Sequence, residues 1–120
     1  MKFMLMIYDN ADTREKFLGP DGTDLMAAVN AVMDELTKSG ELVGGEALAD
    51  PSNTKTVRFV GGAAAVTDGP LAEAKEHFGG YLIVDCDTIE RATEIAAQWP
   101  STAFTPMEVR PLMEQSGADA

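Results

Sequence analysis

The chain has 120 residues, and its 9 basic and 20 acidic residues give a formal net charge of −11. This length predicts one domain, at about 150 residues per domain, and the 45% hydrophobic fraction is typical of a globular protein rather than a disordered one. Proteins that bind nucleic acids or anionic membranes collect Lys and Arg against phosphates, so the acidic balance argues against both partners.

The first part of the chain predicts a strand, a helix and a second strand. Residues 2–8 form a continuous apolar run, typical of a strand that is buried on both faces, and the polar segment 9–22 is predicted as a loop. Apolar residues at spacings of three and four predict a helix over 23–39, which Gly40 is placed to end in the left-handed conformation. Residues 41–48 predict a weaker strand with a bulge at its glycine pair.

The middle of the chain predicts a β-hairpin. Residues 55–60 alternate in polarity, residues 63–67 return as a short strand, and the Gly-Gly pair between them is typical of a two-residue turn. Residues 71–78 fit either one or two helical turns or an extended loop.

The last part of the chain predicts a strand, a helix and a final strand. Residues 81–86 form a second continuously apolar run, and a helix over 88–99 follows, with Asp87 as its expected N-cap. Residues 107–113 alternate as a strand, and Pro111 places that strand at a sheet edge because proline has no N–H to donate.

Without the hairpin, the order of elements is β-α-β-β-α-β, the ferredoxin-like arrangement of an α+β fold with an antiparallel sheet. The two helices cover one face of this sheet, yet strands 2–8 and 81–84 are apolar on both faces. A large uncovered apolar face is unusual on a monomer, so we expect two copies to pack sheet to sheet as a homodimer. We expect the domain to span 1–114, with 115–120 as a frayed tail.

The sequence also predicts a compartment. The N-terminal apolar run has no cleavage-site pattern after it, and no apolar stretch reaches the roughly 20 residues of a membrane span. Cys86 is the single cysteine, which excludes a disulfide within the chain and suits a reducing environment. We therefore expect a cytoplasmic protein.

The densest polar segment, residues 68–77, holds three carboxylates, Lys75 and the sole histidine, His77. This mixture suits general acid–base catalysis, because a neutral imidazole accepts a proton near pH 7 and a neighbouring carboxylate fixes its tautomer. The candidate catalytic residues are therefore His77 with Asp68 or Glu76. A solvated connecting loop with one exposed histidine accounts for the same composition and stays open as the alternative.

Further residues are candidates for binding a substrate. Arg58 and Lys75 would stabilise negative charge on a ligand, although a basic side chain of this kind suits a surface ion pair equally well. A glycine pair directly before a central strand lets a ligand approach the backbone closely, which adds Gly79, Gly80 and Tyr81. Tyr8 and Asp9 end the first strand, where either a cleft opens or the chain simply turns.

Most motifs that carry cofactors or metals are absent. The sequence holds no G-x-G-x-x-G, no phosphate-binding loop, no G-x-S-x-G and no H-E-x-x-H. A single histidine excludes a metal site built on two or more imidazoles. We therefore expect neither a cofactor nor a metal.

Four segments resemble the YCII-related family in its DGPF-domain branch: residues 1–8, 42–48, 66–81 and 108–114. The segment 66–81 is the most specific of the four, although the phenylalanine that helps to name the branch is replaced here by Leu71. The resemblance spans nearly the whole chain and implies a ferredoxin-like α+β domain that dimerises as an α/β barrel.

The resemblance implies no settled activity. Family members are often described as candidate small enzymes with a polar pocket at the dimeric barrel, and genes of this branch often neighbour those of alternative sigma factors. A His–Asp pair has been suggested as the active site of the wider family, but this chain offers only His77 for it. Two main hypotheses result: a cofactor-free acid–base enzyme acting on a small organic molecule, or a non-catalytic dimeric ligand-binding or regulatory module. A third interpretation, a purely structural homodimer, stays open. The substrate, the reaction and any protein partner do not follow from the sequence.

Overall fold

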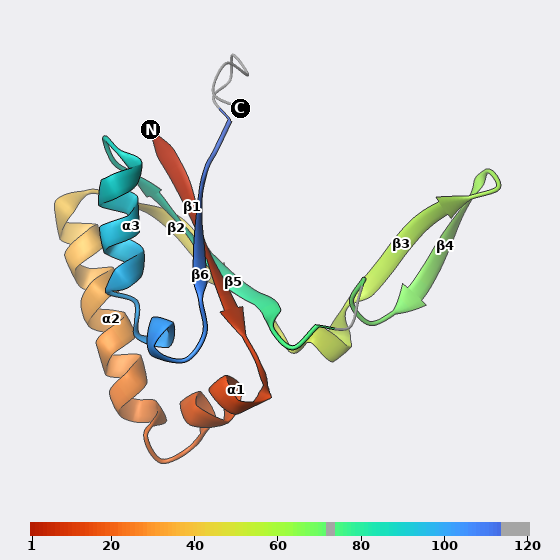
Figure 1. Cartoon of the computed structure of the whole chain (residues 1–120), viewed down its shortest axis with the longest axis horizontal. Coiled ribbons are helices and arrows are strands. Elements are labelled where there is room, and N and C mark those ends of the chain that lie inside the picture. The colour runs from red at the N-terminus through yellow and green to blue at the C-terminus, as the bar shows by residue number, and fades with distance from the viewer. Residues whose placement is uncertain (72–73, 114–120) are drawn as a thin grey trace.

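The computed structural model describes residues 1–71 and 74–113. It contains a four-stranded antiparallel sheet in the order β2-β5-β1-β6, a separate two-stranded hairpin and three α-helices (Figure 1). The elements are β1 (Lys2–Asp9), α1 (Ala11–Leu18), α2 (Gly22–Ser39), β2 (Leu42–Ala47), β3 (Lys55–Val60), β4 (Ala63–Asp68), β5 (His77–Asp85), α3 (Ile89–Ala97) and β6 (Met107–Pro111). The expected tail over 115–120 lies outside the described residues.

The strand order confirms the ferredoxin-like α+β fold. The two continuously apolar runs became the central strands β1 and β5, and β6 lies at an edge, as the proline in it predicted. Helices α2 and α3 lie together on one face of the sheet (Figure 1). No helix stands on the opposite face among the described residues.

The hydrophobic core lies between the sheet and these two helices. Phe3 and Leu5 of β1 are fully buried there, and Leu82 and Val84 of β5 face the same side. Strand geometry turns alternate side chains to the opposite side. The residues between them, Met4, Met6 and Ile83 among others, therefore lie on the helix-free side of the sheet, which we call the open face, and they are half-buried.

Helix α1 corrects the prediction of a loop over 9–22. Asn10 caps it, its Oδ1 accepting hydrogen bonds from the backbone N–H and the hydroxyl of Thr13 at 2.9 Å each. Thr13 is also the one residue of this helix that is buried. A short helix with so little apolar surface leaves no periodic pattern in the sequence, which is why hydrophobic periodicity did not detect it.

Two other boundaries differ from the sequence prediction. The N-cap of α3 is Thr88 rather than Asp87, because the Thr88 hydroxyl accepts the N–H of Arg91 at 3.2 Å. Strand β5 begins at His77, four residues before the start of the predicted apolar run. The extra residues pair with the end of β1, so part of the ambiguous segment 71–78 is strand.

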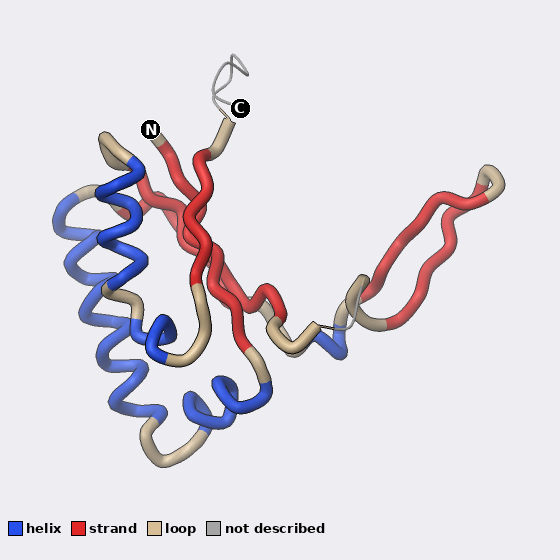
Figure 2. The backbone as a smooth tube through the Cα atoms, viewed as in Figure 1, coloured by secondary structure: helices blue, strands red, loops and turns tan. Residues whose placement is uncertain are grey.

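The hairpin of β3 and β4 stands away from the rest of the molecule (Figures 1 and 2). Its register runs from Lys55↔Asp68 to Val60↔Ala63, and the two turn glycines adopt φ values of 58° and 84°, which confirms the predicted Gly-Gly turn. Every residue of the two strands except Thr56 is exposed. We refer to this hairpin, residues 55–68, as the arm.

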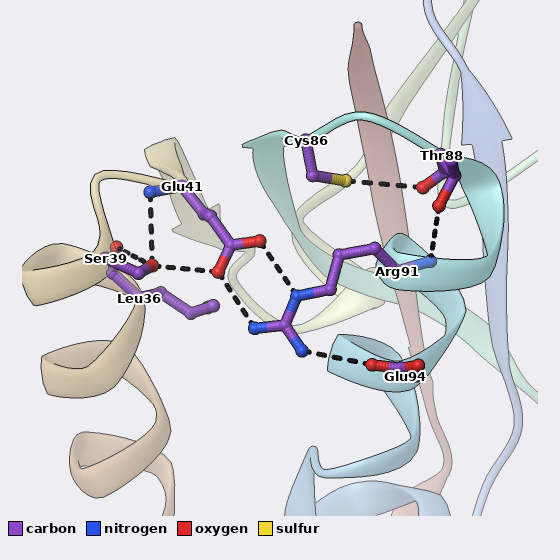
Figure 3. Close-up of polar contacts among 7 residues, drawn as sticks. All are labelled: Leu36, Ser39, Glu41, Cys86, Thr88, Arg91 and Glu94. Atoms are coloured by element: carbon purple, nitrogen blue, oxygen red, sulfur yellow. Dashed lines mark hydrogen bonds and ion pairs between the residues drawn. The ribbon is translucent and has the colours of Figure 1, made fainter.

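A polar cluster ties α3 to the connection between α2 and β2 (Figure 3). The Arg91 guanidinium donates to both carboxylate oxygens of Glu41 at 2.9 Å and to Glu94 at 3.2 Å, and the Ser39 hydroxyl donates to Glu41 at 2.8 Å. Hydrogen bonds from Arg91 are the main cause that lowers the pKa of Glu41 to about 2. None of these four residues lines the cavity described below.

No helix in the described part of the chain combines the length and the apolar character that crossing a membrane requires.

Candidate functional site

A cavity of about 620 Å³ opens between the sheet and the helices at the end where β1 stops and β5 begins. Its wall is mainly apolar, which is usual for a site that binds small organic molecules. Apolar lining residues come from β1, α1 and α2, and these are Ile7, Phe17, Leu18, Met26, Val29 and Met33. The glycines Gly45, Gly79 and Gly80 bring the backbone of β2 and β5 to the same wall.

Strand β1 and helix α1 each supply one charged residue to this wall: β1 supplies Asp9 and α1 supplies Arg14. The Arg14 Nη1 donates to Asp9 Oδ1 at 3.1 Å, and its Nε lies 3.4 Å from Asp50 Oδ1. Asp9 keeps only 23% of its side chain exposed, and Arg14 keeps 31%. Helix α1, which the sequence did not predict, therefore positions the guanidinium that lines the cavity in the described structure.

His77 lies beside this pair. In the ladder between β1 and β5, Asp9 is the direct partner of His77, and directly opposed residues project to the same face with Cβ atoms about 5 Å apart. His77 is half-buried. Hydrogen bonds from Ser52 lower the pKa of Asp50, and the nearby charges of Arg14 and His77 act in the same direction. Asp9 and Arg14 line the cavity, Asp50 contacts Arg14, and His77 is the ladder partner of Asp9. We call these four residues, Asp9, Arg14, Asp50 and His77, the rim cluster.

Gly79 makes room for the Asp9 carboxylate. A Cβ atom at position 79 would lie 2.6 Å from Asp9 Oδ2, closer than real Cβ atoms approach. The ladder is also irregular here, since Ile7 pairs with Gly80 and Tyr8 with Phe78. The bulge and the missing side chain together let Asp9 lie over the strand that carries His77.

Tyr8 lies on the open face, next to this irregularity. Its hydroxyl donates to Glu108 Oε1 at 2.5 Å, and this hydrogen bond is the main cause that raises the pKa of Tyr8. Its ring contacts Phe78 edge to face at 6.0 Å, and Phe78 stacks on Tyr81 at 6.4 Å. Both tyrosines also contribute to the cavity wall, so the aromatic row reaches the rim from the far side of the sheet.

The sequence candidates fall into two groups. Gly79, Gly80 and Tyr81 line the cavity, whereas His77 does not line it and lies beside it as the ladder partner of Asp9. Asp68 and Arg58 belong to the arm, where Asp68 is 84% exposed and bound to Lys55. Lys75 is exposed and Glu76 half-buried, both directly before β5. No hydrogen bond among the described residues joins His77 to Asp68 or Glu76.

Sequence reasoning singled out Asp9 only as a strand end and missed Arg14 and Asp50. The signal that could have pointed to this site is the polar end of the first strand at Tyr8 and Asp9, because both residues line the cavity. In residues 1–71 and 74–113, no three His, Cys, Asp or Glu side chains gather in a way that would hold a metal ion.

Comparisons with known proteins agree with this fold. Over 116 residues the chain is 28% identical to an uncharacterized protein of Rhizobium meliloti (strain 1021), covering 93% of this chain and 92% of the relative. The solved structure of TftG, the 5-chloro-2-hydroxyhydroquinone dehydrochlorinase of Burkholderia phenoliruptrix AC1100 in complex with 2,5-dihydroxybenzoquinone, is similar with a TM-score of 0.59. That match has 16% identity and covers 99% of this chain and 100% of TftG.

A comparison with protein families also covers nearly the whole chain. The sequence profile of the YCII-related domain matches residues 1–116. This span includes the six strands and three α-helices that the structure describes. It also includes the four residues of the rim cluster. The chain belongs to the YCII-related domain family.

Proposed function

We propose that the protein is a cofactor-free enzyme that binds a small organic molecule in the cavity and moves a proton with His77. The observation that carries this proposal is the pairing of Asp9 with His77 in the β1–β5 ladder at the rim of the cavity. A carboxylate beside an imidazole is the arrangement that orients a general acid or base. The apolar wall supplies the surroundings in which such a pair acts on an organic substrate.

In this proposal the parts of the site have separate roles. His77 takes a proton from the substrate and returns it to the substrate or to a leaving group. Asp9 holds the imidazole in one tautomer, and Arg14 keeps the Asp9 carboxylate in place through their 3.1 Å contact. Gly79, Gly80 and Tyr81 form the wall against which the substrate lies.

The similarity to TftG supports a small ring compound as the class of substrate. TftG has the same fold over its full length and is described as a dehydrochlorinase in complex with a dihydroxybenzoquinone. Removal of hydrogen chloride includes loss of a proton, so a ferredoxin-like chain of this kind is compatible with proton-transfer chemistry on a small ring. By this analogy we propose phenolic and quinonoid compounds as the first substrates to test.

Other candidates from the sequence remain part of the proposal. Asp68 and Glu76 are the alternative carboxylates for His77, and Lys75 and Arg58 are the alternative cations for a charged substrate. Two features favour Asp9 over the other carboxylates: it faces the same side of the ladder as His77, and it lines the cavity.

We also propose a homodimer, a cytoplasmic location and the DGPF branch of the family. The open face supports the dimer, because its apolar side chains have no helix over them in the described structure. Packing of two such faces would give a dimeric α/β barrel. The single cysteine, buried and free, suits a reducing compartment, and the segment 66–81 supports the branch.

The experiment uses the fact that the chain has one histidine. Its ring gives one set of carbon-bound proton signals in NMR spectra, so a shift on adding a phenol or quinone reports binding at the rim. Turnover of a compound found in this way is then measured for His77→Gln. We expect a loss of about 10²- to 10⁴-fold with an unchanged melting temperature.

Three carboxylate variants decide the partner of His77. We expect Asp9→Asn to lower turnover by at least about tenfold, and Asp68→Asn and Glu76→Gln to change it less than about twofold. A loss confined to either of the last two variants would transfer the orienting role to that residue. Unchanged turnover in His77→Gln would contradict the acid–base proposal.

The second candidate function is a non-catalytic module that senses a metabolite, including one linked to an alternative sigma factor. The observation in its favour is the wall itself, because flexible side chains such as Phe17, Met26 and Met33 line much of the cavity and adapt to different ligands. Binding of a compound that stays chemically unchanged, and that His77→Gln binds equally well, would favour this function over the enzyme.

A further inference from the structure

Among the described residues, the two strands of the arm pair only with each other. The arm projects from the body (Figures 1 and 2), and the Cα radius of gyration is 16.5 Å. A compact domain of 120 residues has a radius of gyration of about 14 Å. An isolated two-stranded hairpin is at best marginally stable in water. The arm therefore needs a surface outside its own chain to support it.

One side of the arm is apolar. The register pairs Val57 with Val66 and Phe59 with Ala64, so these four side chains project to the same side. Phe59 is 77% exposed, Val57 63% and Val66 59%. The other side carries the polar residues Thr56, Arg58 and Thr67 together with Val60 and two alanines, and the ion pair of Lys55 and Asp68 lies at the base of the apolar side. Three large apolar side chains aligned and exposed on one side are typical of an interaction surface.

Charge identifies the kind of partner. The arm holds two basic residues, Lys55 and Arg58, and one acidic residue, Asp68, which pairs with Lys55, whereas the whole chain has a net charge of −11. The arm is thus slightly basic, and the rest of the chain carries the entire negative excess. A second copy of this chain offers the excess of carboxylates that suits the arm. Because the sheet-to-sheet contact proposed above would occupy the open face, the arm would pack on the partner's body beside that contact.

We propose that the arm is a dimerisation arm, whose apolar side packs against the body of a second copy while the second copy's arm packs in return. Such a reciprocal contact is the self-complementary interface of a two-fold dimer. This contact extends the sheet-to-sheet dimer proposed above, on which this inference rests. It also explains why the apolar side chains of the arm are exposed to water in a single chain.

Two adjacent positions of β4 test the arm with the same change of charge. Val66 lies on the apolar side and Thr67 on the polar side, and both are exposed. Sedimentation equilibrium gives the dimer dissociation constant of the full-length wild type, Val66→Asp and Thr67→Asp. We expect Val66→Asp to raise this constant at least about tenfold and Thr67→Asp less than about threefold. Melting temperatures within about 2 °C of one another would show that the body stays folded in all three.

A third variant separates the arm from the sheet contact. Ile83→Asp introduces a charge on the open face and should also dissociate the dimer. A dimer that Ile83→Asp breaks but Val66→Asp leaves intact would overturn the arm proposal and leave the sheet-to-sheet dimer. Equal effects of Val66→Asp and Thr67→Asp would also overturn it. A wild type that is monomeric would overturn both, and the arm would then belong to a different partner. None of these outcomes depends on turnover.

Discussion

Two arginines of this chain each bridge two carboxylates, and they differ in almost every other respect. Arg91 donates two hydrogen bonds of 2.9 Å to Glu41, which is 17% exposed (Figure 3). Arg14 makes single contacts of 3.1 and 3.4 Å to Asp9 and Asp50. Only Arg14 lines the cavity.

The difference shows how the same residue types divide between structure and function. A bidentate ion pair is strong and directional. Here it joins the start of α3 to the connection between α2 and β2, so it stabilises the packing of these elements. A pair with single, longer contacts at a cavity rim leaves acceptor capacity on its carboxylates for a ligand or a neighbouring imidazole. We therefore expect the Arg91 cluster to govern stability and the rim cluster to govern binding.

The largest expected effect on stability comes from removing the guanidinium of Arg91, and removal of the Arg14 guanidinium is the comparison. Arg91→Ala leaves the half-buried Glu41 carboxylate without its main partner, which should cost about 2 kcal/mol of unfolding free energy. Arg14→Ala should cost less than about 0.5 kcal/mol, because the contacts that it loses are single and partly exposed. Urea unfolding measures both. Equal losses would show that the two clusters do not differ in the way proposed.

The pH dependence of stability should follow Glu41. Its pKa falls from 4.5 to about 2 on folding, so its contribution is complete above pH 4.5 and is lost as the pH falls toward 2. The Arg91 side chain is 39% exposed, so solvent screens the pair and we expect this contribution to be about 1–2 kcal/mol. The stability difference between wild type and Glu41→Gln should therefore shrink between pH 5 and pH 2. Parallel curves over this range would contradict the assignment.

The cap of α1 links stability to the rim cluster. Asn10→Ala removes the acceptor for two donors of Thr13 and should cost about 1 kcal/mol. Because the same helix carries Arg14, we expect ligand affinity at the cavity to fall as well. Asn10→Asp keeps the cap and serves as the matched control. Ligand affinity that is unchanged in Asn10→Ala would show that α1 does not position the site.

A small effect on stability, with a clear effect on binding, is expected at Gly79. The Cβ of Gly79→Ala meets the flexible end of the Asp9 side chain, which can turn aside at a cost of less than about 1 kcal/mol. Moving that carboxylate should still change the NMR signals of the His77 ring and weaken ligand binding several-fold. Gly44→Ala, where a Cβ meets nothing within 4 Å, is the control. An unchanged His77 spectrum in Gly79→Ala would argue against contact between Asp9 and the histidine.

Much of the fold was predictable because it rests on short-range signals. Apolar runs predicted the central strands, apolar periodicity and Gly40 predicted α2 with its left-handed end, and Pro111 predicted an edge strand. Helix α1 was not predicted, because a polar cap at Asn10 and one buried residue determine it rather than an apolar stripe.

The site was only partly predictable. The sequence singled out His77 and the segment Gly79–Tyr81, which the structure brings to the cavity or its rim. Asp68 was chosen as a partner because it is close in sequence, but its carboxylate binds Lys55 in the arm. Asp9 meets His77 through the register of a ladder, and sequence distance contains no information about register.

The sequence by itself determined the types and order of most elements, the glycine turn of the hairpin and the family resemblance, because hydrogen-bonding preferences and apolar periods act over a few residues. The tertiary structure alone decided that residues 9, 14, 50 and 77 share one rim and that the arm stands apart from the body. These outcomes depend on strand register and on how the elements pack together. Such long-range contacts are selected by burying the whole core, not by any single segment.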